Sequence, residues 1–185
     1  MQLTGGIQLP ATIDTILSRR SIREFTDEKV CREDIETILN TARWAPSGLN
    51  NQPWKFMVIQ NEETMDKLED CTHYAKVIRS APLLIAVFLD RETMYNHTKD
   101  VQAIGAAIQN MLLACCDLGL GAVWLGEILN QEEKVNLILS CPESLELMAV
   151  IAIGHPVQGS DSSPRKLRKD LKDICYDENC GKNWR

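Results

Sequence analysis

The amino-acid sequence predicts a single domain of the α+β or α/β class, in which helices cover a central sheet. Two observations predict this class. Segments with the apolar pattern of strands alternate along the chain with segments that have the spacing of amphipathic helices. The chain also has 185 residues, 44% of them hydrophobic, which suffices for one substantial core. Because no repeat, low-complexity run or Gly/Ser-rich linker divides the chain, we expect residues 1–185 to form one domain.

Four strands are expected. Residues 83–89 form a continuous apolar run rich in branched side chains, which is typical of a strand buried on both faces. Residues 54–58 place large apolar side chains at alternate positions, as a half-buried strand does. Two further apolar segments, residues 122–125 and 145–153, complete the expected sheet.

Six helices are expected from helical spacing, at residues 12–17, 31–43, 62–69, 73–79, 101–118 and 131–139. The segment 101–118 is the most apolar of them. Its small residues Gly105, Ala106 and Ala107 permit close approach, so we expect this helix at the centre of the molecule or at a subunit interface. The polar residues 157–185 are expected to lack a core of their own and to wrap a partner subunit.

The composition argues against several kinds of partner and site. The formal net charge is −6 and the pI is near 5.1, so we expect neither a nucleic-acid nor a membrane partner. The first residues lack the basic and apolar regions of a secretory signal, and we expect a cytoplasmic protein. The seven cysteines form no C-x-x-C pair and the three histidines are widely spaced, so no metal site is expected. We expect most of the cysteines to be small buried hydrophobic residues.

The segment Ser18-Arg-Arg-Ser-Ile-Arg23 is a dense basic cluster in this acidic chain. Guanidinium groups bind phosphate oxygens through paired hydrogen bonds and keep their charge at any working pH, and a serine hydroxyl adds a donor. The alternative is that these cations only complement the dipole at the end of the preceding helix. We favour a phosphate site.

The stretch 41–54 joins an expected helix to an expected strand. Pro46 and Pro53 disfavour helix before them, and Gly48 permits a positive φ. The loop also presents serine, asparagine and glutamine side chains between two tryptophans, a combination that suits a flat heterocycle with polar edges. A simple connection with satisfied turn side chains is the alternative. A separate motif, Gly119-Leu-Gly121, is not a dinucleotide fingerprint, because it follows a helix and precedes a strand.

Together these motifs resemble the nitroreductase family of FMN-dependent oxidoreductases. The resemblance extends over about residues 12–170. It is carried by the order and spacing of Ser18-Arg-Arg-Ser-Ile-Arg23, Ala45-Pro-Ser-Gly-Leu-Asn-Asn-Gln-Pro-Trp54, Gln109-Asn110, Gly119-Leu-Gly121 with Trp124-Leu-Gly126, and Gly154-His-Pro156 with Pro164-Arg-Lys166. It implies a three-layer α/β/α sandwich of the α+β class with a central mixed, largely antiparallel sheet. It also implies a homodimer with two FMN sites at the subunit interface, each built from both chains.

The resemblance implies that one chain binds the FMN phosphate and ribityl chain through Arg19, Arg20 and Ser21. It places Arg23 toward the pyrimidine edge, where a fixed cation stabilises the negative charge of reduced flavin. The other implied contacts are Pro46, Ser47, Gly48 and Asn50 of the second subunit along the isoalloxazine with Gln52 nearby, the backbone of Leu125 and Gly126 next to Trp124 beside flavin N5, Arg165 and Lys166 at the phosphate, and Gln109.

The implied activity is the transfer of a hydride from NAD(P)H through flavin N5 to an electron-poor acceptor, such as a nitroaromatic compound or a quinone, in a ping-pong exchange. The cofactor carries this chemistry, so no catalytic side chain is expected. Segment 90–99 is too short for the substrate lid of the dehalogenating and vitamin-synthesis branches of the family, which argues against those activities.

Three alternatives remain open at the level of the sequence. A flavin-binding storage or sensing protein without turnover needs the same binding motifs. A flavoenzyme with a dedicated substrate is disfavoured by the short segment 90–99. A phosphate-binding structural protein without flavin accounts for the arginines but leaves the 41–54 loop unexplained.

Overall fold

A four-stranded antiparallel sheet forms the centre of the molecule. The computed structural model describes residues 11–160 and 168–184. The strands are β1 (Trp54–Ile59), β2 (Leu83–Asp90), β3 (Gly121–Leu125) and β4 (Leu145–Gly154), in the order β1-β2-β4-β3. We expected a mixed, largely antiparallel sheet, and in the described part of the chain every neighbouring pair of strands is antiparallel.

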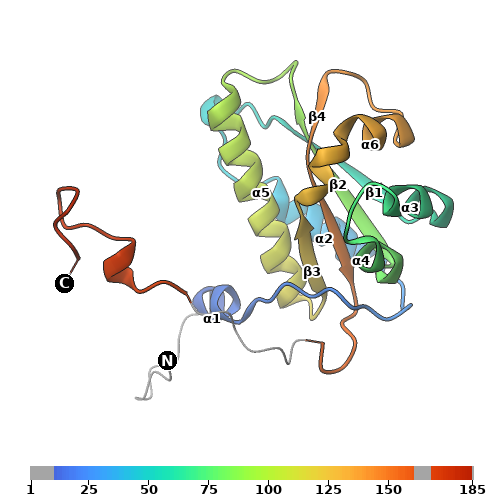
Figure 1. The fold of residues 1–185 in the computed structure, drawn as a ribbon, viewed down its shortest axis with the longest axis horizontal. Helices are drawn as coiled ribbons and strands as arrows, with labels where there is room; N and C mark the ends of the chain where they lie inside the picture. Colours follow the sequence, from blue (N-terminus) through green and yellow to red (C-terminus); the bar gives the residue numbers. More distant parts are fainter. Residues whose placement is uncertain (1–10, 161–167, 185) are drawn as a thin grey trace.

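Helices cover both faces of this sheet and make it the middle of three layers (Figure 1). The helices α2 (Arg32–Ala42) and α5 (His97–Asp117) lie on one face. On the other face lie α3 (Glu62–Glu69), α4 (Ala75–Ser80) and α6 (Glu132–Ile138). Short 3₁₀ turns occur at η1 (Gly48–Asn50), η2 (Glu127–Gln131) and η3 (Leu171–Asp173), and α1 (Ala11–Ser18) packs near the end of α5. The expected α+β sandwich is therefore confirmed.

Strand β2 explains why the core has two halves. All eight of its residues are buried. Alternate side chains of a strand point to opposite faces. Accordingly, Leu83 and Ile85 belong to the apolar cluster under α2 and α5, whereas Leu84 and Phe88 belong to the cluster under α3, α4 and α6. The continuous apolar run in the sequence is thus the signature of a strand covered on both sides.

Each expected helix and strand is present, and the largest difference in bounds is at the start of α5. This helix begins at His97 rather than at residue 101, because the side chain of Asn96 accepts a hydrogen bond from the backbone N–H of Lys99 and caps the helix. Among the described residues, no helix combines the length and apolar character needed to cross a bilayer. Residues 168–184 lie away from the three layers and contribute no buried core residue (Figure 1).

The expectation that most cysteines are buried is wrong. Only Cys71 and Cys115 are buried, whereas Cys31 and Cys180 are exposed and the other three are partly exposed. Burial raises the pKa of the Cys115 thiol to about 12, so this thiol is protonated and unreactive at neutral pH. The exposed cysteines lie at the cap of α2 and in the C-terminal segment, where a polar side chain is equally compatible with the fold.

Candidate functional site

The arginine segment, residues 18–23, follows α1 and lies along the free edge of β3. The N–H of Ile22 donates to the carbonyl of Ala122 at 3.1 Å, and Phe25 forms a bridge with Pro156 at the end of β4. The contact is close: a Cβ at Gly121 would lie 2.7 Å from the side chain of Ile22. The small residue at that position therefore lets the segment approach the sheet.

A cavity of about 480 Å³ adjoins the arginine segment. Its lining includes Arg19, Arg20 and Cys116, together with the stretches 119–122 and 156–159, and none of the described residues that line it carries a carboxylate. Within the described ranges, no carboxylate forms an ion pair with either arginine. Two guanidinium groups without an anionic partner among the described residues, beside a cavity, are suited to hold an anion, and the guanidinium fork matches the geometry of phosphate oxygens.

Ser21, Arg23 and the end of β3, which were predicted to act together with Arg19 and Arg20, follow the same sheet edge. Ser21 and Arg23 are exposed, and Nη1 of Arg23 donates to the carbonyl of Ser21 at 3.2 Å. At the end of β3 the side chain of Leu125 is buried, whereas Trp124 is 41% exposed and Gly126 is exposed. Gly126 is therefore the exposed residue where the backbone leaves β3, and the expected backbone contact at Leu125 and Gly126 stays a prediction.

Glu127, which the sequence analysis did not single out, fixes the segment that follows β3. Its carboxylate accepts hydrogen bonds from Oγ1 of Thr72 at 2.6 Å and from the N–H of His73 at 3.0 Å. These two bonds lower the pKa of the Glu127 carboxyl. The connection ties Gly126 to the turn before α4, so the backbone next to the expected flavin contact is held in place.

The amide loop, residues 46–52, has an unusual backbone. Leu49, Asn50 and Gln52 have positive φ angles of 55°, 56° and 49°, a conformation that costs energy for residues other than glycine and that asparagine tolerates best. The hydroxyl of Ser47 accepts a hydrogen bond from the N–H of Gln52 at 3.1 Å and closes the loop. The chain thus maintains a strained turn, which is a common property of binding loops.

A buried carboxylate holds this loop. Asp100 is fully buried, and its Oδ1 accepts a hydrogen bond from Nδ2 of Asn51 at 3.0 Å. Its Oδ2 accepts from the N–H groups of Tyr95 at 2.9 Å and Asn96 at 3.1 Å. Nδ2 of Asn51 also reaches the carbonyl of Thr93 at 3.2 Å. Sequence reasoning missed Asp100, because an acidic residue beside a polar segment gave no sign of being buried.

The arginine segment and the amide loop, which are the two halves of the predicted site, lie at opposite ends of α5. The amide loop contacts Asp100 in the first turn, and Oγ of Ser18 lies 3.9 Å from Sγ of Cys116 near the last turn. At ~1.5 Å per residue, Asp100 and Cys116 are about 24 Å apart along the helix axis. Gln109 lies between them on the exposed face of α5. One chain therefore brings the arginines together with β3 but does not bring them to its own amide loop.

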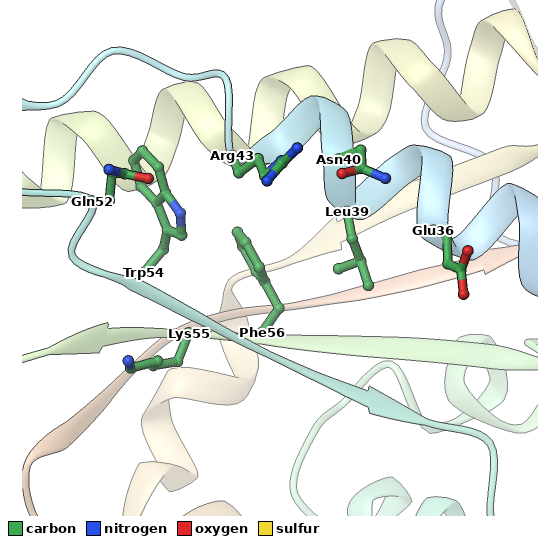
Figure 2. Close-up of a pocket in the computed structure, with 8 residues that line it drawn as sticks. All are labelled: Glu36, Leu39, Asn40, Arg43, Gln52, Trp54, Lys55 and Phe56. Atoms are coloured by element: carbon green, nitrogen blue, oxygen red, sulfur yellow. The ribbon is translucent and has the colours of Figure 1, made fainter. Parts of the chain in front are cut away.

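A second hollow, of about 600 Å³, lies between α2 and β1 on the amide-loop side. It is lined by Glu36, Leu39, Asn40, Arg43, Gln52, Trp54, Lys55 and Phe56. Figure 2 shows Gln52 beside the indole of Trp54, with Phe56 directed toward α2. Gln52 thus lines a different hollow from Arg19 and Arg20. The predicted contacts Arg165 and Lys166 lie outside the described residues.

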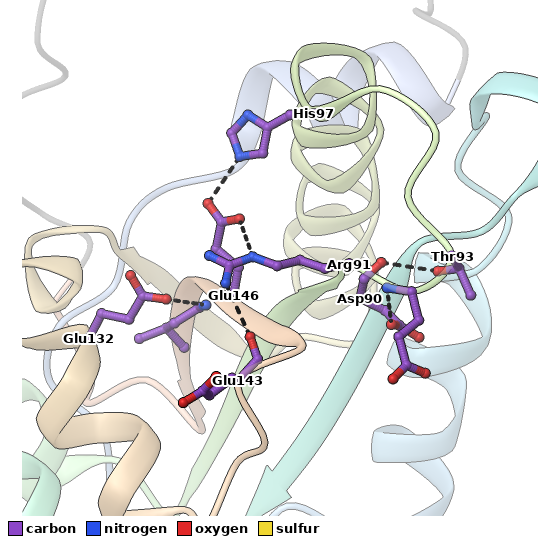
Figure 3. Close-up of polar contacts among 9 residues, drawn as sticks. Asp90, Arg91, Thr93, His97, Glu132, Glu143 and Glu146 are labelled. Atoms are coloured by element: carbon purple, nitrogen blue, oxygen red, sulfur yellow. Dashed lines mark hydrogen bonds and ion pairs between the residues drawn. The ribbon is translucent and has the colours of Figure 1, made fainter.

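A cluster of charged residues lies beside the segment that joins β2 to α5 and links both of its ends to Glu146 (Figure 3). Oε2 of Glu146 accepts a hydrogen bond from Nε of Arg91 at 3.2 Å, and Oε1 of Glu146 lies 3.0 Å from Nε2 of His97. Burial opposes ionisation of Glu146, but the bonds from His97 and Arg91 outweigh it and lower the pKa of this carboxyl.

Comparison with known proteins gives a consistent result. A profile of the Nitroreductase family matches residues 16–73 and 69–155. A protein of Archaeoglobus fulgidus assigned as an NADH dehydrogenase/NAD(P)H nitroreductase is 36% identical over 150 residues, which cover 79% of this chain and 86% of that protein. The FMN reductase (NADPH) of Bacillus subtilis is 30% identical over 176 residues, which cover 83% of this chain and 69% of that enzyme.

A solved structure leads to the same family. A crystal structure described as a nitroreductase of Desulfovibrio desulfuricans in complex with FMN superimposes with a TM-score of 0.87 at 45% sequence identity. The superposition covers 93% of this chain and 99% of that protein.

Proposed function

The chain belongs to the nitroreductase family, and on that premise we propose that it is an FMN-dependent oxidoreductase that takes its electrons from NAD(P)H. When bound, FMN supplies the hydride transfer, first from the nicotinamide and then to the acceptor, for which electron-poor compounds such as nitroaromatics and quinones are the proposed class. The protein contributes binding, orientation and charge.

The cavity beside the arginine segment suits the phosphate of FMN. Arg19 and Arg20 line it without a carboxylate competitor among the described residues, and its volume of about 480 Å³ lies in the range typical of cofactor sites. We propose that these arginines bind the phosphate, that Ser21 adds a hydrogen bond, and that Arg23 opposes the negative charge of the reduced cofactor. The backbone at Leu125 and Gly126 is proposed to face the reacting edge.

The observation that carries the proposal is the separation of the two halves along α5. Both halves open at the surface, and about 24 Å of helix keeps them apart in one chain. We propose a two-fold homodimer in which the amide loop of one chain meets the arginine segment of the other. Pro46, Ser47, Gly48 and Asn50 are then proposed to contact the flavin bound mainly by the partner subunit.

Exposed apolar side chains support an interface in the same place. Three apolar side chains of α1, Ile13, Ile16 and Leu17, are about half exposed, and Trp44 and Leu49 beside the amide loop are almost fully exposed. Gly105 and Ala106 keep the middle of the open face of α5 small. Such a surface is expected to be covered by another protein chain.

The C-terminal segment supplies further apolar surface. Leu171, Ile174, Tyr176 and Trp184 are each more than half exposed. We propose that residues 157–185 wrap the partner subunit, where these side chains become buried.

A mixed-dimer experiment tests the shared site. One chain carries Arg19→Ala and Arg20→Ala, the other carries Ser47→Ala and Asn50→Ala, and differently tagged copies are co-expressed and purified as the mixed species. We expect each parent dimer to lose FMN and the mixed dimer to retain one FMN per pair of chains, because one of its two sites is intact. A mixed dimer without FMN, from parents that do not bind it, would show that each site belongs to a single chain.

Turnover is tested separately with the unaltered protein. Steady-state oxidation of NADH and NADPH is measured with a quinone and a nitroaromatic acceptor. We expect rates well above those of free FMN at the same concentration. A rate no higher than that of free FMN would assign the protein to flavin storage rather than catalysis.

A further inference from the structure

The ring of Tyr95 occupies the space that a side chain at position 48 would need. A Cβ built on Gly48 would overlap the phenol oxygen and the adjacent ring carbons of Tyr95. Gly48 is part of the amide loop, and Tyr95 belongs to the short segment that joins β2 to α5. The aromatic ring is therefore in direct contact with the backbone of the proposed flavin-binding loop.

The same buried carboxylate holds both segments. Oδ1 of Asp100 binds Asn51 of the amide loop, and Oδ2 binds the backbone N–H groups of Tyr95 and Asn96. Asp100 is fully buried, and its three hydrogen bonds are between 2.9 Å and 3.1 Å long. The two segments therefore form one rigid unit. A ligand that contacts the amide loop at Gly48 is thus also close to Tyr95.

The outer face of this unit carries a cation beside an aromatic ring. Tyr95 is 42% exposed, and Nζ of Lys99 lies 5.4 Å from the centroid of its ring, within the range of a cation–π contact. In the described part of the chain, Lys99 has no ion-pair partner. The ammonium group is therefore held near the phenol and remains available to an anion.

We propose that Tyr95 and Lys99 form the acceptor-facing wall of the site and select aromatic acceptors that carry an anionic substituent. The proposal rests on the proposed function, which puts the amide loop along the flavin. The ring of Tyr95 packs against the aromatic body of the acceptor, and the Lys99 ammonium attracts its carboxylate. The unit thus takes the place of a long substrate lid.

The test uses the FMN-loaded protein and a matched pair of acceptors, 4-nitrobenzoate and 4-nitrobenzamide, which differ chiefly in charge. Lys99→Gln is expected to lower kcat/KM for 4-nitrobenzoate about 5-fold, mainly through KM, with less than a 2-fold change for the amide. Tyr95→Ala is expected to lower kcat/KM for both by about 10-fold, whereas Tyr95→Phe retains most of it. Lys29→Gln, which removes another exposed lysine, should change neither.

Binding supplies a readout that does not depend on turnover. Benzoate and benzamide are titrated into the oxidised protein and followed by the absorbance of the bound flavin. We expect Lys99→Gln to weaken benzoate about 5-fold and to leave benzamide unchanged, with FMN content equal in all variants. Equal effects on both compounds, or none on benzoate, would overturn the proposal. A colourless unaltered protein would instead contradict the proposed function.

Discussion

The arginine segment and the amide loop, the two halves of the proposed ligand site, are held in place in different ways. The arginine segment is tied to the sheet by main-chain hydrogen bonds, such as that from Ile22 to Ala122, and its guanidinium groups are left to the cavity. The amide loop has a strained backbone that depends on the buried Asp100. In the proposed site, the arginine segment supplies charge and the amide loop supplies shape. Damage to the first should therefore reduce ligand affinity alone, and damage to the second should also reduce stability.

The largest effect is expected from Asp100→Asn, on the amide-loop side. The two carboxylate oxygens of Asp100 accept hydrogen bonds from three N–H donors, whereas an asparagine amide has only one acceptor oxygen. We expect the free energy of unfolding to fall by about 1–3 kcal/mol for each buried donor that loses its acceptor. Urea denaturation of the apoprotein measures this loss.

Asp117→Asn is the matched control for that substitution. Asp117 lies at the other end of α5, where it is exposed and accepts one hydrogen bond from Thr15 at 2.9 Å. Its substitution should change the free energy of unfolding by less than ~0.5 kcal/mol. Equal losses for the two variants would contradict the idea that the hydrogen bonds at the amide-loop end of α5 contribute more to the free energy of unfolding.

Arg20→Ala tests the arginine side. Removing one charge-assisted contact should weaken FMN by about 1.5–3 kcal/mol, which is roughly 10- to 100-fold in affinity. The urea midpoint of the apoprotein should not change. FMN fluorescence titration gives the affinity, and Arg32→Ala, at an exposed arginine paired with Glu36, provides the comparison. Loss of apoprotein stability in Arg20→Ala would remove the contrast between the two regions.

Gly48→Ala tests the contact between the amide loop and Tyr95. The added methyl group must displace the phenol, at an expected cost of about 1–3 kcal/mol in unfolding free energy. Adding Tyr95→Ala should relieve the clash, so Gly48→Ala should cost less in that background. Additive losses in this double-mutant cycle would show that the ring yields without strain.

The smallest expected effect concerns pH and Glu146. Because the pKa of this carboxyl is lower in the folded protein than in the unfolded chain, its contribution is present above the unfolded value near ~4.3 and is lost as pH falls through the folded pKa. Glu146→Gln should lower the free energy of unfolding by about 0.5–1 kcal/mol at pH 6. The difference between the two proteins should shrink as the pH is lowered below ~4. A difference that is independent of pH would assign the effect to packing.

Local patterns predicted the elements of the fold well. The apolar run of β2 and the spacing of α2 and α3 reflect burial that each segment shows in its own residues. The start of α5 was misplaced because its first turn is polar and is stabilised by the Asn96 cap rather than by apolar spacing. The cysteines were misjudged for a related reason, since the small size of cysteine suits a surface as well as a core.

The sequence by itself determined the parts of the proposed site: a basic segment whose side chains suit a phosphate and a stiff, amide-rich loop. These properties are chemical and local, so they can be read from residue types and spacing. Only the tertiary structure decided where the parts lie, because they contact α5 at Asp100 and at Cys116, which are about 24 Å apart along the helix axis. It also decided that Asp100 is buried and that Tyr95 lies on Gly48. Each depends on contacts between segments that are distant in sequence. The residue pattern of a single segment does not reveal such packing.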